Sequence, residues 1–390
     1  MTGAKPSILF VHAGAEMYGA DRILLELVGG LMAQGYPVCV VLPGHGPLGQ
    51  EFSRLGIEPI ICNLGILRRK YFSFSGLINR STRLFSAVKQ LIWIIRQNDI
   101  SIVHSNTTAV LAGALASKIV GVQHIWHVHE ITTKPRWFAI LLAACVSTLS
   151  CQVVFVSEAA KAHMCRLYPR IQRKAVVIHN GIDESRAVSG HRGLIRRECG
   201  WSESDFVVGM IGRINWWKGQ NKLVDCAEAL VPITHGLKFL LVGGTYASDE
   251  QLRDQLIGRV IRSDLTNCVT IQDFRTDIGN VLADIDVFVL PSTEPDPFPT
   301  VVLEAMAASR PIVAFRHGGV CEMIENGVTG FLCEPCSSQE MASVISHLEA
   351  NRKTAIVLGK AGLSRLRALY TREAFLTKFT QLYDEFSTKV

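Results

Sequence analysis

The residues best placed for chemistry lie between positions 286 and 304, where an apolar strand, a proline-rich loop and a helical pattern follow one another. We expect a helix to begin near Pro299, because a proline at the first helical position lacks only an N–H that would have no partner there. The N–H groups of that first turn favour an anion. Asp296 in the loop and Glu304 on the helix add two carboxylates. A phosphate at the helix N-terminus, with two acids able to hold hydroxyls, is chemistry suited to a nucleotide sugar.

A second loop carries two cations. The segment Gly-Arg-Ile-Asn-Trp-Trp-Lys-Gly at 212–219 follows an apolar strand and precedes a helical pattern. Arg213 and Lys218, five positions apart in such a junction, can lie over a diphosphate, and each charge-assisted contact contributes roughly 1.5–3 kcal/mol. The alternative is a surface loop with incidental charges.

Two further segments stand at expected strand ends in the first half of the chain. The run His-Ala-Gly-Ala-Glu-Met-Tyr-Gly-Ala-Asp-Arg at 12–22 has glycines that let backbone approach a phosphate, or that form only a tight turn. His127 and His129 lie at a later strand end, and strand alternation places both on one face. A structural role for either histidine is the alternative to a role in binding.

The elements that position these residues alternate strand and helix in both halves of the chain. This pattern predicts two α/β domains, each a doubly wound parallel sheet with helices on both faces, in which ligands bind beyond the carboxyl ends of the strands. A polar, glycine-containing stretch separates them. The expected division is an N-terminal Rossmann-like domain at 1–180, a linker at 181–204, a C-terminal Rossmann-like domain at 205–370 and a helix at 371–390 that packs back toward the first domain. Strands are expected at 7–12, 37–42, 58–62, 100–104, 124–128, 152–156, 175–179, 206–211, 238–242, 268–271, 286–290, 311–315 and 330–333, with helices between them, for example at 21–34 and 107–120.

The run from Pro291 to Ala307 resembles the acid-x7-acid signature of glycosyltransferase family 4, retaining enzymes of the GT-B fold. Similar family segments occur at 212–219, 19–21, 155–157, 179–183 and 318–332, so the resemblance covers nearly the whole chain and is thin only between 66 and 97. It implies two Rossmann-like domains facing a central cleft. It also implies a hexosyltransferase-type enzyme that moves a sugar from a nucleotide-sugar donor to an acceptor, with retention, as in polysaccharide biosynthesis on a lipid-linked or cell-surface glycan precursor.

The resemblance assigns roles residue by residue. Arg213 and Lys218 would stabilise the nucleoside diphosphate leaving group. Glu304 would hold the ribose hydroxyls and Asp296 the donor sugar. The family usually has Glu at the first acidic position, so Glu294 remains able to share the role of Asp296. His129 would contact the donor sugar, with His127 in reserve. The full set implied for donor binding is Gly19, Arg213, Lys218, Asp296, Phe298, Pro299, Thr300, Val301 and Glu304, with the backbone amides near Thr300 and Val301 meeting the phosphate.

We expect neither a cofactor nor a metal beyond the donor itself. Asp284 and Asp286 have the spacing of a metal-binding pair, but they precede an apolar strand, where a helix cap or a strand-edge role is favoured. Cys333 and Cys336 lack the second ligand pair that zinc requires, so we interpret them as structural.

Composition is that of a globular protein, with 48% hydrophobic and 19% charged residues. Eleven cysteines scattered among apolar residues, and a first strand without a preceding cleavable signal, favour a reducing cytoplasm. Residues 137–156 carry no charge, but polar residues interrupt them, so a buried helix followed by a strand is favoured over a membrane span.

The net charge of +6 is unevenly distributed. Residues 1–180 hold 18 basic and 8 acidic residues, and 66–96 holds seven basic residues and no acid among large apolar ones. This composition suits an anionic membrane surface, so we expect a peripheral contact on the inner face of the membrane, with a solvated helix face as the alternative. No nucleic-acid reader motif accompanies the patch, and nucleic acid is not an expected partner.

Two other functions remain open on the same scaffold. One is a sugar-nucleotide epimerase, which would need added acid and base residues. The other is a catalytically silent binding subunit, which damaged phosphate and sugar positions would indicate. The sequence leaves open the nucleotide base (UDP, GDP or ADP), the sugar, the acceptor and linkage, and the oligomeric state.

Overall fold

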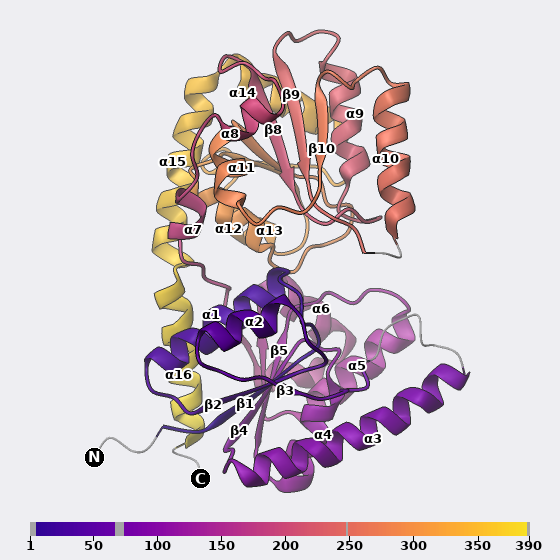
Figure 1. Cartoon of the computed structure of the whole chain (residues 1–390), viewed down its shortest axis with the longest axis vertical. Helices are drawn as coiled ribbons and strands as arrows, with labels where there is room; N and C mark the ends of the chain where they lie inside the picture. The colour runs from indigo at the N-terminus through magenta and orange to yellow at the C-terminus, as the bar shows by residue number, and fades with distance from the viewer. Residues whose placement is uncertain (1–4, 67–73, 247–248, 388–390) are drawn as a thin grey trace. The chain divides into compact units, whose positions relative to one another are not determined.

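The computed structural model describes residues 5–66, 74–246 and 249–387, which form two compact units (Figure 1). Unit 1 comprises Met1–Gly181 together with Arg372–Val390, and unit 2 comprises Ile182–Thr371. Each unit is one parallel sheet with helices on both faces, so the expected α/β, doubly wound class is confirmed.

Unit 1 is built on a seven-stranded sheet in the order β3-β2-β1-β4-β5-β6-β7. Its strands are β1 (Ile8–His12), β2 (Val38–Leu42), β3 (Ile60–Ile61), β4 (Ile102–Asn106), β5 (Gln123–Val128), β6 (Gln152–Phe155) and β7 (Ala175–Val177). Its helices are α1 (Gly19–Ala33), α2 (Pro47–Arg54), α3 (Phe74–Gln97), α4 (Leu111–Val120), α5 (Arg136–Leu149), α6 (Glu158–Leu167), the 3₁₀ helix η2 (Pro169–Lys174) and α16 (Arg372–Ser387).

The central strand β1 shows why both faces are covered. Ile8 and Phe10 pack into one core with apolar residues of α1 and α16, whereas Leu9 and Val11 pack into another with residues of α3 and α4. Successive strand side chains point to opposite faces, so a run without polar residues must be buried on both sides.

Helix α16 is last in the sequence but belongs to unit 1. Phe379 is fully buried and lies 5.1 Å, between ring centroids, from His127 of β5. Arg372 pairs with Glu26 of α1 at 2.8 Å. Gly30 of α1 leaves room for this packing, because a Cβ there would lie 2.4 Å from Cδ1 of Leu376. The C-terminal helix therefore closes one face of the first sheet.

Unit 2 is built on a six-stranded sheet in the order β10-β9-β8-β11-β12-β13. Its strands are β8 (Phe206–Ile211), β9 (Leu237–Val242), β10 (Val269–Gln272), β11 (Val287–Leu290), β12 (Ile312–Phe315) and β13 (Gly330–Cys333). Its helices are α7 (Ser185–Val188), α8 (Leu194–Glu198), α9 (Gln220–Leu230), α10 (Glu250–Arg262), α11 (Ile278–Asp284), α12 (Thr300–Ala307), α13 (Val320–Met323), α14 (Ser338–Ala350) and α15 (Arg352–Leu369).

The two strand orders share one property that matters for binding. In each sheet the order reverses beside the first strand of the unit, between β1 and β4 in unit 1 and between β8 and β11 in unit 2. The loops leaving the carboxyl ends of those two strands diverge to opposite faces, which opens a crevice where ligands of such folds bind.

Most expected elements agree with the structure to within two residues at each end, but one helix differs by more and one strand keeps only two of its five expected residues. The helix expected at 107–120 begins only at Leu111, because Thr107 has φ +87° and the backbone N–H of Thr108 is bound by the carboxylate of Glu130. The strand expected at 58–62 is reduced to Ile60–Ile61 at the sheet edge.

The uncharged stretch 137–156 forms most of α5 and then β6, as predicted. The expectation that this helix is buried was only half right, because Trp137 and Leu141 are 62% and 55% exposed. Over the described part of the chain, no helix combines the length and the apolar character needed to cross a membrane.

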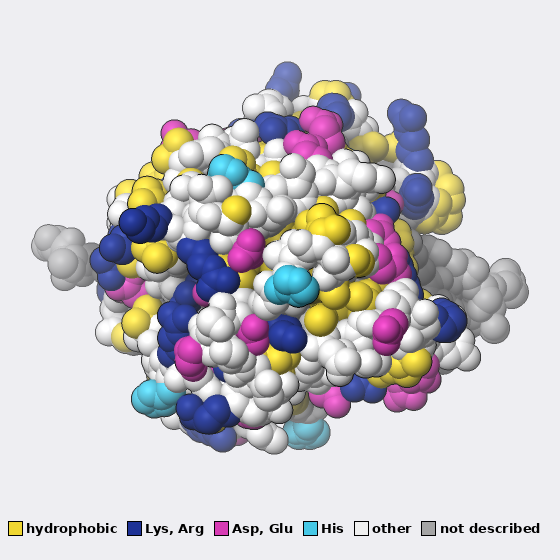
Figure 2. Space-filling model, turned by 90° about the horizontal axis from the view of Figure 1, so that it is seen from above, with side chains coloured by type: hydrophobic (Ala, Val, Ile, Leu, Met, Phe, Trp, Pro, Cys, Tyr) yellow, Lys and Arg dark blue, Asp and Glu magenta, His cyan; other side chains and the backbone are white. Residues whose placement is uncertain are grey.

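One face of the molecule carries charges of both signs. On the face shown in Figure 2, Lys and Arg side chains lie among Asp and Glu side chains. Arg68, Arg69 and Lys70 of the predicted basic segment lie outside the described residues.

Candidate active site

In unit 2 the loops that follow β8 and β11 meet at the point where the strand order reverses. The carbonyl oxygen of Trp217 accepts hydrogen bonds from the backbone N–H and the hydroxyl of Thr293, at 2.7 and 3.2 Å. Gly219 makes this approach possible, because it has φ +82° and a Cβ there would lie 1.7 Å from the carbonyl oxygen of Pro291. The loop that holds Lys218 is thus hydrogen-bonded to the loop that holds Asp296.

Lys218 is held at this junction from two sides. The side-chain oxygen of Asn215 accepts the backbone N–H groups of Trp217 and Lys218, at 3.1 and 2.9 Å, which fixes the turn. The Lys218 ammonium pairs with the Asp296 carboxylate at 2.5 Å, and both side chains are largely buried. An ammonium has three N–H donors, so donors remain for an anionic ligand.

Asp296 is also fixed through its backbone. Its carbonyl oxygen accepts the N–H of Gly319 at 2.8 Å, and Gly318 has φ +68° in a position where a Cβ would lie 2.3 Å from that oxygen. The Ser292 hydroxyl donates to the same carboxylate oxygen as Lys218, at 3.3 Å. Glu294, by contrast, is half-buried in the loop. The structure therefore makes Asp296 the carboxylate that contacts Lys218.

Two residues with separately predicted roles are in contact here, and those roles remain predictions. The sequence separated Lys218, for the phosphate, from Asp296, for the sugar, but the structure brings the two into one ion pair. Arg213 stands at the start of the same loop, with its guanidinium carbon 3.9 Å from the ring centroid of Tyr246 and its carbonyl oxygen bound by the Gln220 side chain. Stacking on an aromatic face orients a guanidinium without removing its charge.

The start of α12 contains the remaining predicted donor-binding residues. Pro299 caps the helix, and Thr300 and Val301 are its first residues, whose N–H groups have no partner one turn back. Glu304 is half-buried one turn further along. The Phe298 side chain is buried and packs edge-on against Tyr370, with 5.5 Å between ring centroids. Phe298 therefore supports the loop, and its predicted donor contact remains a prediction.

In unit 1 the corresponding edge holds a group of hydrogen-bonded polar residues. His12 and Asn106 end β1 and β4, the two strands beside the reversal, and the Asn106 amide nitrogen lies 3.0 Å from Nδ1 of His12. The amide oxygen of Asn106 lies 2.8 Å from Nε2 of His129. Asp21, on the first turn of α1, accepts from Nε2 of His12 at 2.6 Å.

His129, and not His127, is the accessible histidine of the predicted pair. His127 lies within β5, is fully buried and packs against Phe379 and His104. His129 lies just beyond the strand and is half-buried, with its ring 4.0 Å from that of His127. Burial lowers the pKa of the His129 imidazole to about 3, so this ring is neutral at physiological pH. Gly19 is the first residue of α1 at the same edge.

Sequence reasoning missed His12, Asp21 and Asn106 as site residues. Asn106 was missed because the expected strand ended at His104, two residues before the observed end of β4. The sequence feature that could have identified them is the presence of polar residues at the carboxyl ends of the two strands beside the strand-order reversal.

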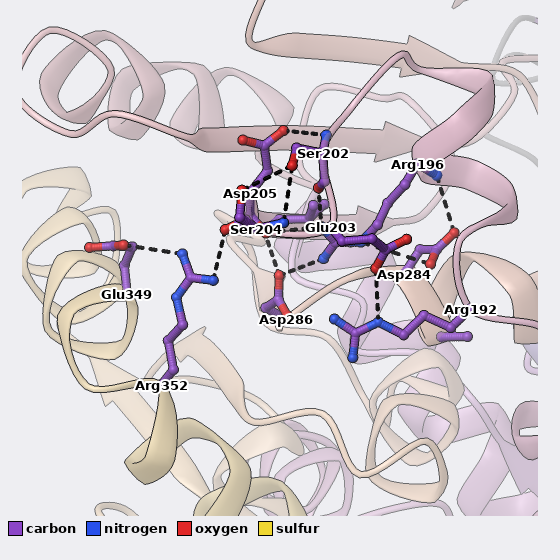
Figure 3. A network of polar contacts seen from close by, with 12 residues as sticks. Arg192, Arg196, Ser202, Glu203, Ser204, Asp205, Asp284, Asp286, Glu349 and Arg352 are labelled. Atoms are coloured by element: carbon purple, nitrogen blue, oxygen red, sulfur yellow. Dashed lines mark hydrogen bonds and ion pairs between the residues drawn. The ribbon is translucent and has the colours of Figure 1, made fainter.

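Asp284 and Asp286 have structural roles, as predicted (Figure 3). Asp284 is 1% exposed and accepts the N–H groups of Gly193, Ile195 and Arg196 at the start of α8. Asp286 accepts from the Arg196 guanidinium and from the backbone N–H of Val207, both at 2.8 Å. The pair thus joins the segment before β8 to α11 and β11. Cys333 is buried at the end of β13, and Cys336 is exposed.

Comparison with known proteins gives a consistent result. Residues 192–365 match the family model "Glycosyl transferases group 1", and residues 17–186 match "Glycosyltransferase Family 4". The chain is 30% identical over 293 residues to the alpha-maltose-1-phosphate synthase of Mycobacterium tuberculosis, covering 68% of this chain and 74% of that protein. It is 26% identical to the UDP-Gal:alpha-D-GlcNAc-diphosphoundecaprenol alpha-1,3-galactosyltransferase of Escherichia coli, over 85% of each chain. The crystal structure of Anabaena HepE with UDP and glucose superimposes with a TM-score of 0.83 at 23% identity, covering 97% of this chain and 99% of that one.

The two Rossmann-like units, each with polar loops at its strand-order reversal, have the GT-B fold. The chain belongs to glycosyltransferase family 4. The resemblance inferred from residues 291–307 is therefore confirmed, as are the GT-B fold and the transferase class.

The structural role of Asp284 predicts a large loss of stability on its removal. Asp284→Ala leaves three N–H groups and part of the Arg196 charge buried without an acceptor, so the free energy of unfolding should fall by about 3–5 kcal/mol. Chemical denaturation measures this. The control is Asp273→Ala, which removes an exposed partner of Arg253 and should change stability by less than about 1 kcal/mol. An Asp284→Ala protein of normal stability but without activity would contradict the structural role.

Proposed function

We propose that this protein is a retaining glycosyltransferase that moves a sugar from a nucleotide-sugar donor to a lipid-linked or cell-surface glycan precursor. The observation that carries the proposal is the Lys218–Asp296 pair at the strand-order reversal of unit 2, where Lys218 shares a loop with Arg213 and Asp296 lies four residues before the start of α12. Two names among the similar proteins support it. HepE was solved with UDP and glucose, and the Escherichia coli relative is named for UDP-Gal and a diphosphoundecaprenol acceptor.

The chemistry would depend on stabilising charge on the leaving group. The bond between the anomeric carbon and the diphosphate oxygen breaks, and its electron pair goes to the diphosphate. Lys218, Arg213 and the N–H groups of Thr300 and Val301 are the donors we assign to that developing charge. The acceptor hydroxyl forms the new bond on the face that the diphosphate leaves, and its proton goes to the departing phosphate oxygen. The configuration is retained without a protein nucleophile.

The carboxylates would divide the rest of the donor between them. We assign the ribose hydroxyls to Glu304, one turn into α12. Asp296 has two tasks in this proposal: one oxygen orients the Lys218 ammonium, and the carboxylate also faces the donor sugar. In unit 1 we assign sugar contacts to His129 and a backbone approach to the diphosphate and acceptor to Gly19.

Removing Lys218 should reduce turnover far more than stability. Lys218→Ala removes a charge that acts on the leaving diphosphate, so kcat should fall about 10²-fold or more. Turnover is measured as transfer or as slow donor hydrolysis over a panel of UDP-, GDP- and ADP-sugars. Lys222→Ala is the matched control. Lys222 lies four residues after Lys218, on α9, where it pairs with Asp225. Near-normal turnover by folded Lys218→Ala would refute the assignment.

No metal or cofactor is part of the proposed mechanism, because two cations and a helix N-terminus already neutralise the leaving group. We therefore expect transfer to persist in excess EDTA. The assay is the same donor panel after dialysis against chelator, with added Mg²⁺ or Mn²⁺ as the comparison. Activity that disappears in EDTA and returns with either ion would contradict metal independence.

Unit 1 offers a surface for the membrane part of the proposal. On α3, Phe85 and Trp93 are 63% and 61% exposed, and the Lys89 ammonium lies 4.6 Å above the Phe85 ring. These residues repeat every four positions with Arg96 one turn beyond, so aromatic and basic groups share one helix face. Such a face suits the interface of an anionic bilayer, and its use would place the enzyme on the cytoplasmic face of a membrane.

Binding to anionic vesicles tests this surface. Each basic residue near such a membrane contributes about 1 kcal/mol, so Lys89→Ser with Arg96→Ser should weaken binding to phosphatidylglycerol vesicles about tenfold or more. Lys353→Ser with Lys378→Ser removes the same charge from exposed positions elsewhere and should have little effect. Co-sedimentation at low and physiological salt measures both, with phosphatidylcholine vesicles as the neutral reference. Wild-type protein that ignores anionic vesicles at low salt would leave α3 as a solvated helix.

A further inference from the structure

Four side chains of unit 1 form one continuous hydrogen-bonded series. Asp21 contacts His12 at 2.6 Å, His12 contacts the Asn106 amide nitrogen at 3.0 Å, and the Asn106 amide oxygen contacts His129 at 2.8 Å. The first three residues are at least nine-tenths buried, and only His129, at the end of the series, is partly exposed. The residues come from α1, β1, β4 and the position just after β5, so the series crosses the strand-order reversal.

The order of donors along the series follows from its acidic end. The Asp21 carboxylate can only accept, so Nε2 of His12 carries the proton between them. The Asn106 amide nitrogen can only donate, so Nδ1 of His12 accepts from it and carries no proton. The amide oxygen is left facing Nε2 of His129, which must donate to it. A neutral His129 therefore has its proton on Nε2 and its lone pair on Nδ1.

The surroundings of Asn106 support this amide orientation. The amide nitrogen lies 3.5 Å from the carbonyl oxygen of Ala20, which attracts an N–H and would repel an amide oxygen. A competing contact joins Nδ1 of His12 to the backbone oxygen of Asn106 at 3.3 Å, and it would require a proton on Nδ1. The contact to the amide nitrogen is shorter, at 3.0 Å.

The first residues of the series are themselves fixed. The second oxygen of Asp21 accepts the backbone N–H of Tyr18 at 2.8 Å. Gly14 is required beside it, because a Cβ there would lie 2.5 Å from the Asp21 carboxylate. Thr107, which follows Asn106, has φ +87°, a strained conformation for a β-branched residue. Strain of this kind persists where the surrounding structure holds the backbone in place.

The exposed end of the series is left open for a ligand. Among the described residues, none forms a hydrogen bond with Nδ1 of His129. The His129 backbone is held at the same time, because its N–H donates to the Glu130 carboxylate, which also binds Thr108. Ring and backbone are thus both positioned before any ligand arrives.

We propose that Asn106, oriented by the Asp21–His12 pair, is a positioning residue that fixes the tautomer of His129, so that Nδ1 always accepts a hydrogen bond from a sugar hydroxyl. This proposal rests on the proposed glycosyltransferase function for the identity of the ligand, but not for the tautomer. If the His129 ring rotated freely or exchanged between tautomers, Nδ1 would be able to accept from a sugar hydroxyl for only part of the time. The fixed lone pair selects a hydroxyl over an anionic oxygen, which it would repel.

The tautomer can be measured without any substrate. In ¹⁵N-labelled wild-type protein at pH 7.5, long-range ¹H–¹⁵N spectra should show His129 with a protonated Nε2 and a bare Nδ1. The His129→Gln variant assigns the signals by their loss. Asn106→Leu removes both hydrogen bonds at similar volume, and the His129 nitrogens should move to averaged shifts. Asn106→Asp still presents an acceptor to Nε2 and should keep the wild-type pattern.

Kinetics provides the second readout. We expect Asn106→Leu to lower kcat/KM for transfer about tenfold or more, Asn106→Asp to lower it less, and neither to change the Kd of the nucleoside diphosphate. Thermal unfolding shows whether each variant is folded. The proposal is overturned if wild-type His129 has its proton on Nδ1, or if folded Asn106→Leu keeps the wild-type spectrum. A protein that transfers no sugar but shows the expected tautomers would instead refute the glycosyltransferase proposal and leave the positioning by Asn106 standing.

Discussion

Parallel pairing of β8 with β11 is the constraint on which the unit 2 site depends. The two strands are neighbours although β9 and β10 come between them in the sequence, and Phe288 pairs with Gly209 in the register. A Cβ at Gly209 would lie 2.4 Å from the Ile285 side chain, so this glycine admits the residues that lead into β11. With the strands in register, their carboxyl ends lie together. The loop holding Lys218 then emerges beside the loop holding Asp296.

The same constraint acts in unit 1 with different side chains. Pairing of β1 with β4 places His12 opposite Asn106, and pairing of β4 with β5 places Asn106 opposite His127. His129, two residues further on, then reaches the Asn106 amide oxygen. Both units therefore have polar side chains at a strand-order reversal. Unit 2 has the Lys218–Asp296 ion pair there, and unit 1 has imidazole and amide groups together with the Asp21 carboxylate.

This difference in chemistry follows from burial. Burial lowers the pKa values of His104, His124, His127 and His129, so these rings contribute hydrogen bonds and packing without charge. In unit 2 two buried cations form ion pairs, Lys218 with Asp296 and Arg196 with Asp286. An unpaired buried charge costs several kcal/mol, so the carboxylates beside Lys218 and Arg196 offset the cost of burying these two cations. We infer that the cations of unit 2 suit an anionic ligand group, and that the neutral imidazole of His129 in unit 1 suits a hydroxyl.

The sequence by itself determined the class of fold and the segments that bear the site. Strand periodicity is a local property, so the alternation of apolar strands and helices predicted both sheets, and β8 and β13 were predicted to the residue. The acidic run at 291–307 and the basic loop at 212–219 are local patterns as well. Only the tertiary structure decided that Lys218 pairs with Asp296 across 78 positions and that Asn106 joins His12 to His129. These contacts depend on strand register, on glycines with positive φ and on which face a long connection covers, and no local pattern of residues encodes those distances.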